Sequence, residues 1–216
     1  MTLSTRRSAS VRRLPSDRPQ PPSPPRRPPL WLRVSVPAGV GIQLLATGAG
    51  ALLLAIACGS LDAGIALRKV SLLVGFVLVY LDTHAIGHYL LGRAVKIRFR
   101  GFGLRGTDHP ENYPPVLRQA MSLLPMWVAL TEPASRRAVG GRARAVMYAA
   151  GEASTTICSL AAASATAFSG APWGGTLLVA TIAWNIVASI VVTVIDKGDY
   201  AKALRALRAL RALRAN

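Results

Sequence analysis

Residues 82–89 read Asp-Thr-His-Ala-Ile-Gly-His-Tyr and lie near the end of a long apolar run, Val70–Leu91. The segment holds two of the protein's three histidines, His84 and His88, four residues apart. On a helix, positions i and i+4 share a face, so both imidazoles can point to one ligand. Metal-binding or ionisable side chains are costly inside a membrane segment, which makes this pair a candidate functional site. The alternative is that both histidines are neutral, hydrogen-bonded packing residues, because the pair alone supplies no third ligand.

The composition indicates an integral membrane protein. The 216 residues carry a formal net charge of +17, yet 51% of them are hydrophobic. Arginine and lysine gather in the tails and in one central segment, and the apolar residues form long runs. Basic residues that flank apolar spans follow the positive-inside rule, so we expect no nucleic-acid partner. Cys58 and Cys158 form no metal or disulfide motif and are expected to be small packing residues.

Four apolar stretches are long enough to cross a bilayer, and they predict an all-α integral membrane protein with about four transmembrane helices. The expected membrane domain covers residues 34–199, and its spans are residues 36–58, 70–91, 146–168 and 176–195.

Charge predicts the orientation of these spans. The segment 92–145 between the second and third spans is rich in arginine and is expected to be cytoplasmic, together with both termini. The expectation is a multi-pass protein of the cell membrane. Arg68 and Lys69, in the first outer connection, run against this charge bias.

The two tails have different compositions. Residues 1–33 are rich in proline, arginine and serine, which predicts a disordered cytoplasmic tail. Residues 200–216 repeat Ala-Leu-Arg from Ala203 to Arg214, which predicts a basic helix. That helix would lie on an anionic bilayer surface or be a loosely constrained tail.

The central segment predicts a small strand and a re-entrant piece between the second and third spans. Val95–Arg100 alternates apolar and basic residues, as an edge strand protected by charge does, and the glycines of segment 101–103 are expected to end it. Met121–Leu130 is apolar but too short to span, so we expect a re-entrant or interfacial segment. His109 lies in a polar loop and is expected to be solvated.

The topology places polar groups from distant parts of the chain at one membrane depth. The two histidines lie near the cytoplasmic end of the second span, and Asp196 and Asp199 follow the fourth. Glu152 lies one to two turns inside the third span. Two imidazoles and one carboxylate leave an open fourth position, which is how a catalytic zinc site is built.

Two short segments carry a resemblance to a known family. Residues 84–88 read His-Ala-Ile-Gly-His, and residues 199–207 begin with an aspartate and continue as a basic, leucine-rich segment. They resemble the H-E-x-G-H helix and the Asp-Gly-Gly motif of the intramembrane site-two metalloproteases. The resemblance implies that zinc is bound by three residues, His84, His88 and Asp199.

The chain departs from that family at the general base. The family has a glutamate beside the first histidine, where this chain has Ala85, and Asp82 points to the other side of the helix. Glu152 is the candidate base from the third span, and the alternative is a protonated carboxyl bonded to Ser154 or Thr155. An active protein would be a membrane zinc metallopeptidase, whereas the missing glutamate argues for a pseudoenzyme.

The second motif also departs from the family, and the resemblance has one further implication. The family's second motif has two glycines after the aspartate, where this chain has Tyr200 and Ala201. A basic strand after the first motif, as at residues 96–104, is thought to hold an extended membrane-embedded substrate at a sheet edge.

A second hypothesis comes from a different class of protein. The chain could be a non-enzymatic four-span membrane scaffold or a small transport protein without metal. Its histidines and Glu152 would then serve as polar packing or as a proton relay. The lipid bilayer is a partner under both hypotheses, and the first adds a membrane-embedded protein substrate or partner.

Overall fold

The computed structural model describes residues 29–59, 64–107, 115–194 and 198–215, and this part of the chain is mostly helical with one small sheet. The helices are α1 (Val36–Gly59), α2 (Ile65–Ala94), α3 (Pro115–Leu123), α4 (Pro133–Ala138), α5 (Gly141–Phe168), α6 (Gly174–Val194) and α7 (Gly198–Ala215). The strands are β1 (Leu32–Val34), β2 (Phe99–Arg105) and β3 (Met126–Thr131). Most of the predicted disordered tail lies outside the described residues, and the end of that segment forms part of β1.

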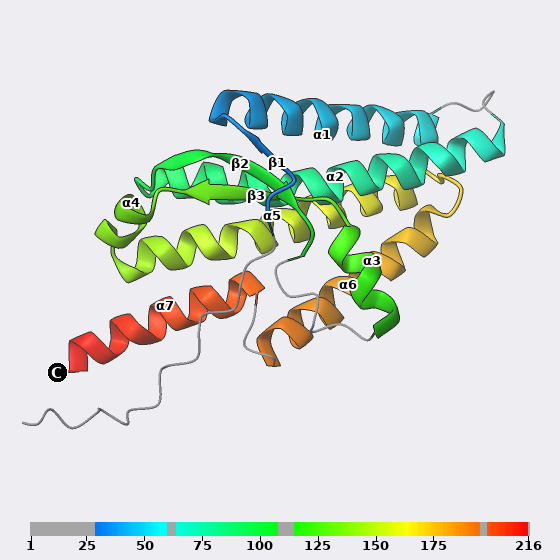
Figure 1. Ribbon diagram of the computed structural model, residues 1–216. Helices are drawn as coiled ribbons and strands as arrows, with labels where there is room; N and C mark the ends of the chain where they lie inside the picture. Colours follow the sequence, from blue (N-terminus) through cyan, green and yellow to red (C-terminus); the bar gives the residue numbers. More distant parts are fainter. Residues whose placement is uncertain (1–28, 60–63, 108–114, 195–197, 216) are drawn as a thin grey trace, which may run out of the picture.

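Two helices of the described chain, α1 and α2, are long and apolar enough to cross a membrane, with 24 and 30 residues. They lie side by side (Figure 1), and their contact depends on two glycines. A Cβ atom on Gly50 or Gly75 would lie 2.8 or 2.7 Å from the carbonyl oxygen of the other residue. Small residues of this kind let the backbones of membrane helices approach closely.

The other two expected spans are also helical, but they are less apolar or shorter. Helix α5 carries Arg142 and Arg144 in its first turn and a glutamate further on, and the apolar part of α6 is the shorter stretch Gly174–Ile190. Both helices belong to the same bundle, because α5 packs against α2 and α6 packs against α5. The structure therefore gives four helices close to the expected positions, two of which have the length and apolarity of a span.

Contacts within the bundle account for the two basic residues that oppose the charge bias. Helix α2 begins at Ile65, so Arg68 and Lys69 lie in its first turns and not in a loop. Arg68 donates a hydrogen bond from Nε to the carbonyl oxygen of Ala57, 3.0 Å away at the end of α1. Lys69 Nζ lies 4.3 Å from the centre of the Trp173 ring, a cation–π contact with the turn between α5 and α6. Both basic side chains thus contact the ends of neighbouring helices.

The sheet is antiparallel in the order β1-β2-β3, so β2 is its central strand. A strand is present in this segment, but it runs over Phe99–Arg105, so the predicted bounds Val95–Arg100 and the predicted edge position are wrong. Residues 95–97 instead close α2, since Ile97 N–H donates to the carbonyl oxygen of Gly92 at 2.8 Å. The glycines expected to end the strand lie inside it, where Gly101, with φ +144°, lets the backbone of β1 come close.

The predicted re-entrant segment at Met121–Leu130 divides into two elements. Its first residues end α3, and the rest form β3 on the edge of the sheet. The sheet packs on α2 through aromatic contacts, because Phe102 of β2 lies 5.6 Å from Tyr89, centre to centre. Phe102 also lies directly against Gly39 of α1, so one buried ring connects the sheet to both long helices.

An apolar cluster lies between α1, α2 and the turn that follows α5. It is formed by Leu54, Ala57, Leu72, Val79 and Ala171. Cys58 and Cys158 are unpaired and pack against this cluster, which confirms the packing role expected from the sequence.

Helix α7 begins at Gly198, five residues before the Ala-Leu-Arg repeat, and so includes Asp199 in its first turn. It lies alongside the first half of α5 (Figure 1), with Ala206 against Gly141. Arg205 and Arg208 are exposed on its other side. The start of α7 therefore reaches back into the bundle, where α2 and α5 meet.

Candidate metal centre

The two histidines of α2 meet Asp199 of α7. His84 and His88 share one helix face, with ring centres 4.9 Å apart. Their Nε2 atoms lie 3.1 and 2.9 Å from a single oxygen, Asp199 Oδ2. Within the described chain, these three residues form the group of His, Cys, Asp or Glu side chains that could hold a metal ion, with ligand atoms within 4.8 Å of one another. The predicted ligand set is thus brought together from positions 115 and 111 residues apart.

The other nitrogen of each ring is held by α5. His88 Nδ1 lies 2.7 Å from the carbonyl oxygen of Met147, which can only accept a hydrogen bond, so His88 carries a proton on Nδ1. His84 Nδ1 lies 3.2 Å from Thr155 Oγ1. Because that hydroxyl donates to the carbonyl oxygen of Gly151 at 3.1 Å, it accepts from His84. Both rings therefore turn Nε2 towards Asp199 in the tautomer that suits a metal ligand.

This arrangement needs a positive charge at its centre. With protons fixed on Nδ1, neutral imidazoles would place two Nε2 lone pairs against a carboxylate oxygen at hydrogen-bond distance. Such contacts between acceptors are unfavourable, so the site holds protons on both Nε2 atoms or a cation among the three ligands. The side chains are largely buried, with exposed fractions of 22% for His84 and 13% for His88 and Asp199. Burial strengthens that requirement because water screens the charges less.

Asp199 is ionised at this position. Burial alone would raise the pKa of its carboxyl group, but the hydrogen bonds with the two histidines and the charges of His88 and Lys202 outweigh burial and hold that pKa well below its usual value. Its place in the first turn of α7 also favours a negative charge. Gly198, with φ +81°, directly precedes it, a backbone conformation that glycine adopts without strain.

Lys202 holds the second oxygen of the same carboxylate. Its Nζ lies 2.7 Å from Asp199 Oδ1, one turn along α7. The ion pair leaves Oδ2 directed at the histidines and fixes the rotation of the carboxylate. It also supplies a positive charge that balances Asp199 when the histidines are neutral.

Small residues of α2 and α5 make the close contact possible. A Cβ atom on Gly151 of α5 would overlap the ring of His88, and one on Gly87 of α2 would overlap the hydroxyl of Ser154. Ser154 donates instead to the carbonyl oxygen of Thr83 at 2.9 Å, which is a second link between the helices. The imidazole of His88 therefore occupies the space that a side chain at position 151 would take.

Glu152 lies beside this centre without joining it. It follows Gly151 on α5, and the charges that act on its carboxyl group come from four residues, His84, Asp199, His88 and Lys202. The hydroxyls of Ser154 and Thr155, considered above as its partners, donate to backbone carbonyls. The structure thus brings the candidate base near the triad and outside the set of metal ligands.

The other acidic and histidine candidates take no part in the described centre. Asp82 is buried on the other face of α2, where it hydrogen-bonds with Trp127 of β3, as its helical position predicts. Ala85, at the position where the resembling family has its glutamate base, is fully buried. His109 and Asp196 lie outside the described residues.

Sequence reasoning missed the groups that orient the ligands. The carbonyl of Met147 belongs to the backbone and has no signature in a sequence. Thr155 and Gly151 could have been suspected, because they lie four residues apart on one face of the helix that carries Glu152. Lys202 lies three residues after Asp199, the spacing of a neighbour on the same helix face.

The residues present fit a zinc ion. Two histidines and one aspartate are a usual set of three protein ligands, and a fourth position then remains for water or substrate. Ligands of a tetrahedral zinc ion lie about 3.3 Å from one another when each is about 2.0–2.1 Å from the metal. The two separations from Asp199 Oδ2, 2.9 and 3.1 Å, need lengthen by a few tenths of an ångström, and the two imidazole nitrogens, which lie within 4.8 Å of each other, need to be about 3.3 Å apart.

Comparison with family models, with curated proteins and with solved structures gave no match to this chain.

Proposed function

We propose that this chain is a membrane-embedded zinc protein of the site-two-protease type, which has lost efficient peptidase activity and binds membrane-embedded protein segments. The observation that carries the proposal is one carboxylate oxygen of Asp199 held 3.1 and 2.9 Å from two imidazole nitrogens. The opposite nitrogens of both rings are tied to α5. A zinc ion satisfies all three ligands at once and leaves a position open.

The membrane part of the proposal rests on the packing of the bundle. Helices α1 and α2 have the length and apolarity of spans, and α5 packs along α2. We propose that α5 and α6 cross the same bilayer, so that four spans leave both termini in the cytoplasm. The metal centre then lies at the cytoplasmic end of α2, near the arginine-rich connection.

The chain lacks a base next to its first histidine. A zinc ion in this centre would lower the pKa of a bound water and polarise a carbonyl group. Hydrolysis also needs a group that accepts the proton of that water. Ala85 cannot do so, and it is fully buried. Glu152 is the remaining candidate, on another helix, and the lack of a base beside the first histidine favours a protein that binds without cutting.

The metal content of the purified protein in detergent tests the proposal. We expect about one zinc ion per chain in the wild type and almost none after His84→Ala/His88→Ala, because two of three ligands are lost. His109→Ala is the matched control, and we expect it to keep its zinc. A folded wild type without metal would overturn the zinc site.

The same preparations test the loss of activity. We expect no cleavage of a membrane-embedded reporter substrate by the wild type. Cleavage that disappears in Glu152→Gln would show instead that the protein is a peptidase with Glu152 as its base.

One contact favours the second candidate function, a scaffold or small transport protein without metal. Lys202 already pairs with Asp199 at 2.7 Å, so the charge of the carboxylate is balanced without a metal, and protons on the two imidazole Nε2 atoms would complete the hydrogen bonds of the cluster. This candidate predicts no metal in any preparation. It also predicts that the fold survives the change of both histidines to asparagine.

A further inference from the structure

Helix α7 runs antiparallel to the first half of α5. Near the start of α7, Lys202 Nζ lies 5.9 Å from the centre of the Tyr148 ring of α5. Further along α7, the carbonyl oxygen of Ala206 and the Cβ atom of Leu210 face Gly141, where an added Cβ atom would lie 2.8 and 3.3 Å from them. This part of α7 is therefore level with the first residue of α5.

The pairing of the two helices brings arginines together around this contact. The arginine cluster consists of Arg142 and Arg144 in the first turn of α5 and Arg205 and Arg208 in the part of α7 beside it. Three of its side chains are exposed, and that of Arg144 is half-buried. The sequence has no acidic residue in segment 133–151 or after Asp199, so these segments supply no carboxylate to balance the cluster. Like charges gathered in this way repel one another and attract an anion.

A buried donor also favours an anion at this place. Arg144 Nε is buried, and within the described part of the chain no group accepts a hydrogen bond from it. Buried polar groups normally have a hydrogen-bond partner. Helix α5 begins at the same place after Gly140, which offers no side-chain cap, so the first amides of the helix and its dipole also favour a negative group. A ligand with charged oxygen atoms would satisfy both.

The four-span arrangement puts the cluster at the depth of the lipid headgroups. A hydrocarbon core of about 30 Å takes about 20 helical residues, so a core that begins at Val70 of α2 ends near Tyr89. The residue before it, His88, lies 2.7 Å from the carbonyl oxygen of Met147 in α5. Arg144 lies about one turn from Met147 towards the cytoplasm, about 4.5 Å beyond the core. This depth is that of the headgroup region.

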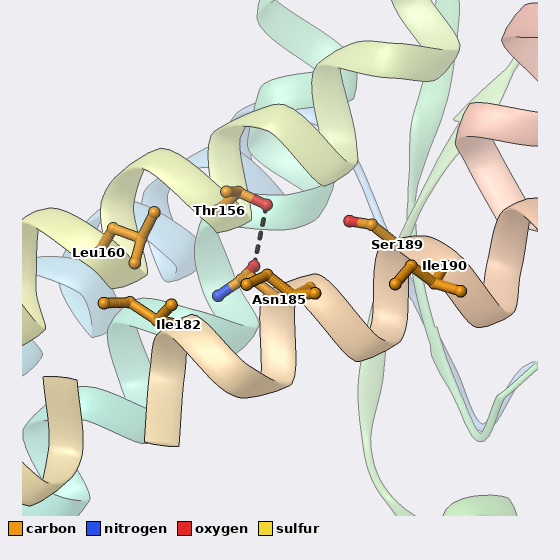
Figure 2. Close-up of a pocket in the computed structure, with 7 residues that line it drawn as sticks. Thr156, Leu160, Ile182, Asn185, Ser189 and Ile190 are labelled. Carbon is orange, nitrogen blue, oxygen red and sulfur yellow. Dashed lines mark hydrogen bonds between the residues drawn. The ribbon is translucent and has the colours of Figure 1, made fainter. Parts of the chain in front are cut away.

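The estimate of depth requires α5 to lie within the membrane between α2 and α6, and hydrogen bonds to both helices support that position. Thr156 of α5 donates to Asn185 Oδ1 of α6 at 2.9 Å across a groove that both helices line (Figure 2). Two residues earlier, Ser154 donates to the carbonyl oxygen of Thr83 in α2 at 2.9 Å. Hydrogen bonds of this kind link helices within membranes. The inference thus rests on the four spans of the proposed function, and it does not depend on the metal.

We propose that the arginine cluster binds the phosphate group of an anionic phospholipid in the cytoplasmic leaflet. A guanidinium group stays charged at physiological pH and binds phosphate through two parallel hydrogen bonds. The cytoplasmic surface of the bilayer concentrates anionic headgroups at this depth, which favours a lipid over free phosphate or an acidic protein segment. Because its arginines come from both helices, the bound phosphate holds α7 against α5.

Native mass spectrometry of the full-length protein in detergent tests this site. The protein is titrated with phosphatidylglycerol and with phosphatidylcholine of the same acyl chains, which differ in headgroup charge. We expect the wild type to bind phosphatidylglycerol about 10-fold or more tightly than phosphatidylcholine, because each arginine near an anionic surface strengthens binding about 5-fold. The triple variant Arg142→Gln/Arg144→Gln/Arg208→Gln should lose this preference. The single variant Arg208→Gln, at an exposed position, should weaken phosphatidylglycerol binding about 5-fold and decides the matter if the triple variant does not fold.

Arg33→Gln/Arg100→Gln/Arg118→Gln is the charge-matched control. It removes the same number of positive charges from exposed positions in the sheet and in α3. We expect it to keep the wild-type preference for phosphatidylglycerol. An equal loss in the two triple variants would overturn the site and indicate a general effect of charge. Equal binding of the two lipids by the wild type would overturn it as well.

Competition experiments separate the lipid from other anions. Displacement of phosphatidylglycerol by an equal concentration of inorganic phosphate or of a polyglutamate peptide would overturn the choice of a lipid. Zinc content, measured in the same preparations, separates this site from the metal centre. A metal-free wild type that prefers phosphatidylglycerol would overturn the zinc function and support the lipid site, whereas a zinc-loaded wild type without that preference would do the reverse.

Discussion

The absence of a side chain at Gly151 is what allows His88 to lie between α2 and α5. A Cβ atom there would overlap three atoms of the imidazole ring, Nε2, Cε1 and Cδ2. We therefore predict that Gly151→Ala displaces the ring from Asp199 and lowers metal affinity at least 10-fold, measured by cobalt titration.

Gly48→Ala on α1 is the control for this prediction, because a Cβ atom at Gly48 has no atom within 4 Å. That variant should keep its metal affinity and gain up to about 1 kcal/mol in helix stability. Wild-type affinity in Gly151→Ala would show that His88 does not occupy this space.

At the level of single residues, the candidate ligands could be predicted from the sequence, but the groups that orient them could not. The i and i+4 spacing of His84 and His88 predicted one face with two imidazoles, and the resemblance to the site-two metalloproteases then implied Asp199 as the third ligand. The tautomers were not predictable, because they depend on the carbonyl of Met147 and on a hydroxyl from another helix. The fit of Gly151 against a ring becomes visible only when the pairing of α2 with α5 is known.

Among the helices and strands, the packing of the sheet on the helices depends on one aromatic ring, that of Phe102. Phe102 of β2 is fully buried and contacts Gly39 of α1 and Tyr89 of α2. We predict that Phe102→Ala lowers the free energy of unfolding by about 3–5 kcal/mol, because the lost ring leaves a cavity between three elements. Unfolding of the protein in detergent, followed by circular dichroism, measures the change.

Phe168→Ala is the matched control, since the side chain of Phe168 at the end of α5 is 88% exposed. The same substitution there should change stability by about 0.5 kcal/mol or less. Equal effects of the two variants would contradict the connecting role of Phe102.

The elements also show where sequence patterns mislead. Alternation of apolar and basic residues indicated a strand at residues 95–100, but the backbone closes α2 with residues 95–97 and places Lys96 at φ +66°. Local hydrogen bonds to the end of a helix thus outweighed the strand pattern, and the strand begins only at Phe99. Because β2 is paired on both sides, an extended partner could add only to β1 or β3.

For the whole molecule, contacts between distant segments show which helix ends lie together. Lys69 at the start of α2 meets Trp173 in the turn between α5 and α6. Those two segments are the predicted outer connections, and the contact places them at the same end. Asp199, which follows α6, meets His88 near the other end of α2.

These contacts predict the result of reporter fusions in bacterial cells. Alkaline phosphatase, which is active only outside the cytoplasm, should be active when inserted within residues 60–63 or at Gly170. It should be inactive within residues 108–114 and after Asn216, where a fluorescent reporter should fluoresce. The physical reason is the excess of arginine on segment 92–145 and on α7, because the positive-inside rule predicts that such segments stay in the cytoplasm. Phosphatase activity at residues 60–63 but not at Gly170 would mean that α5 and α6 do not cross the membrane. That result could not be reconciled with the contact between Lys69 and Trp173.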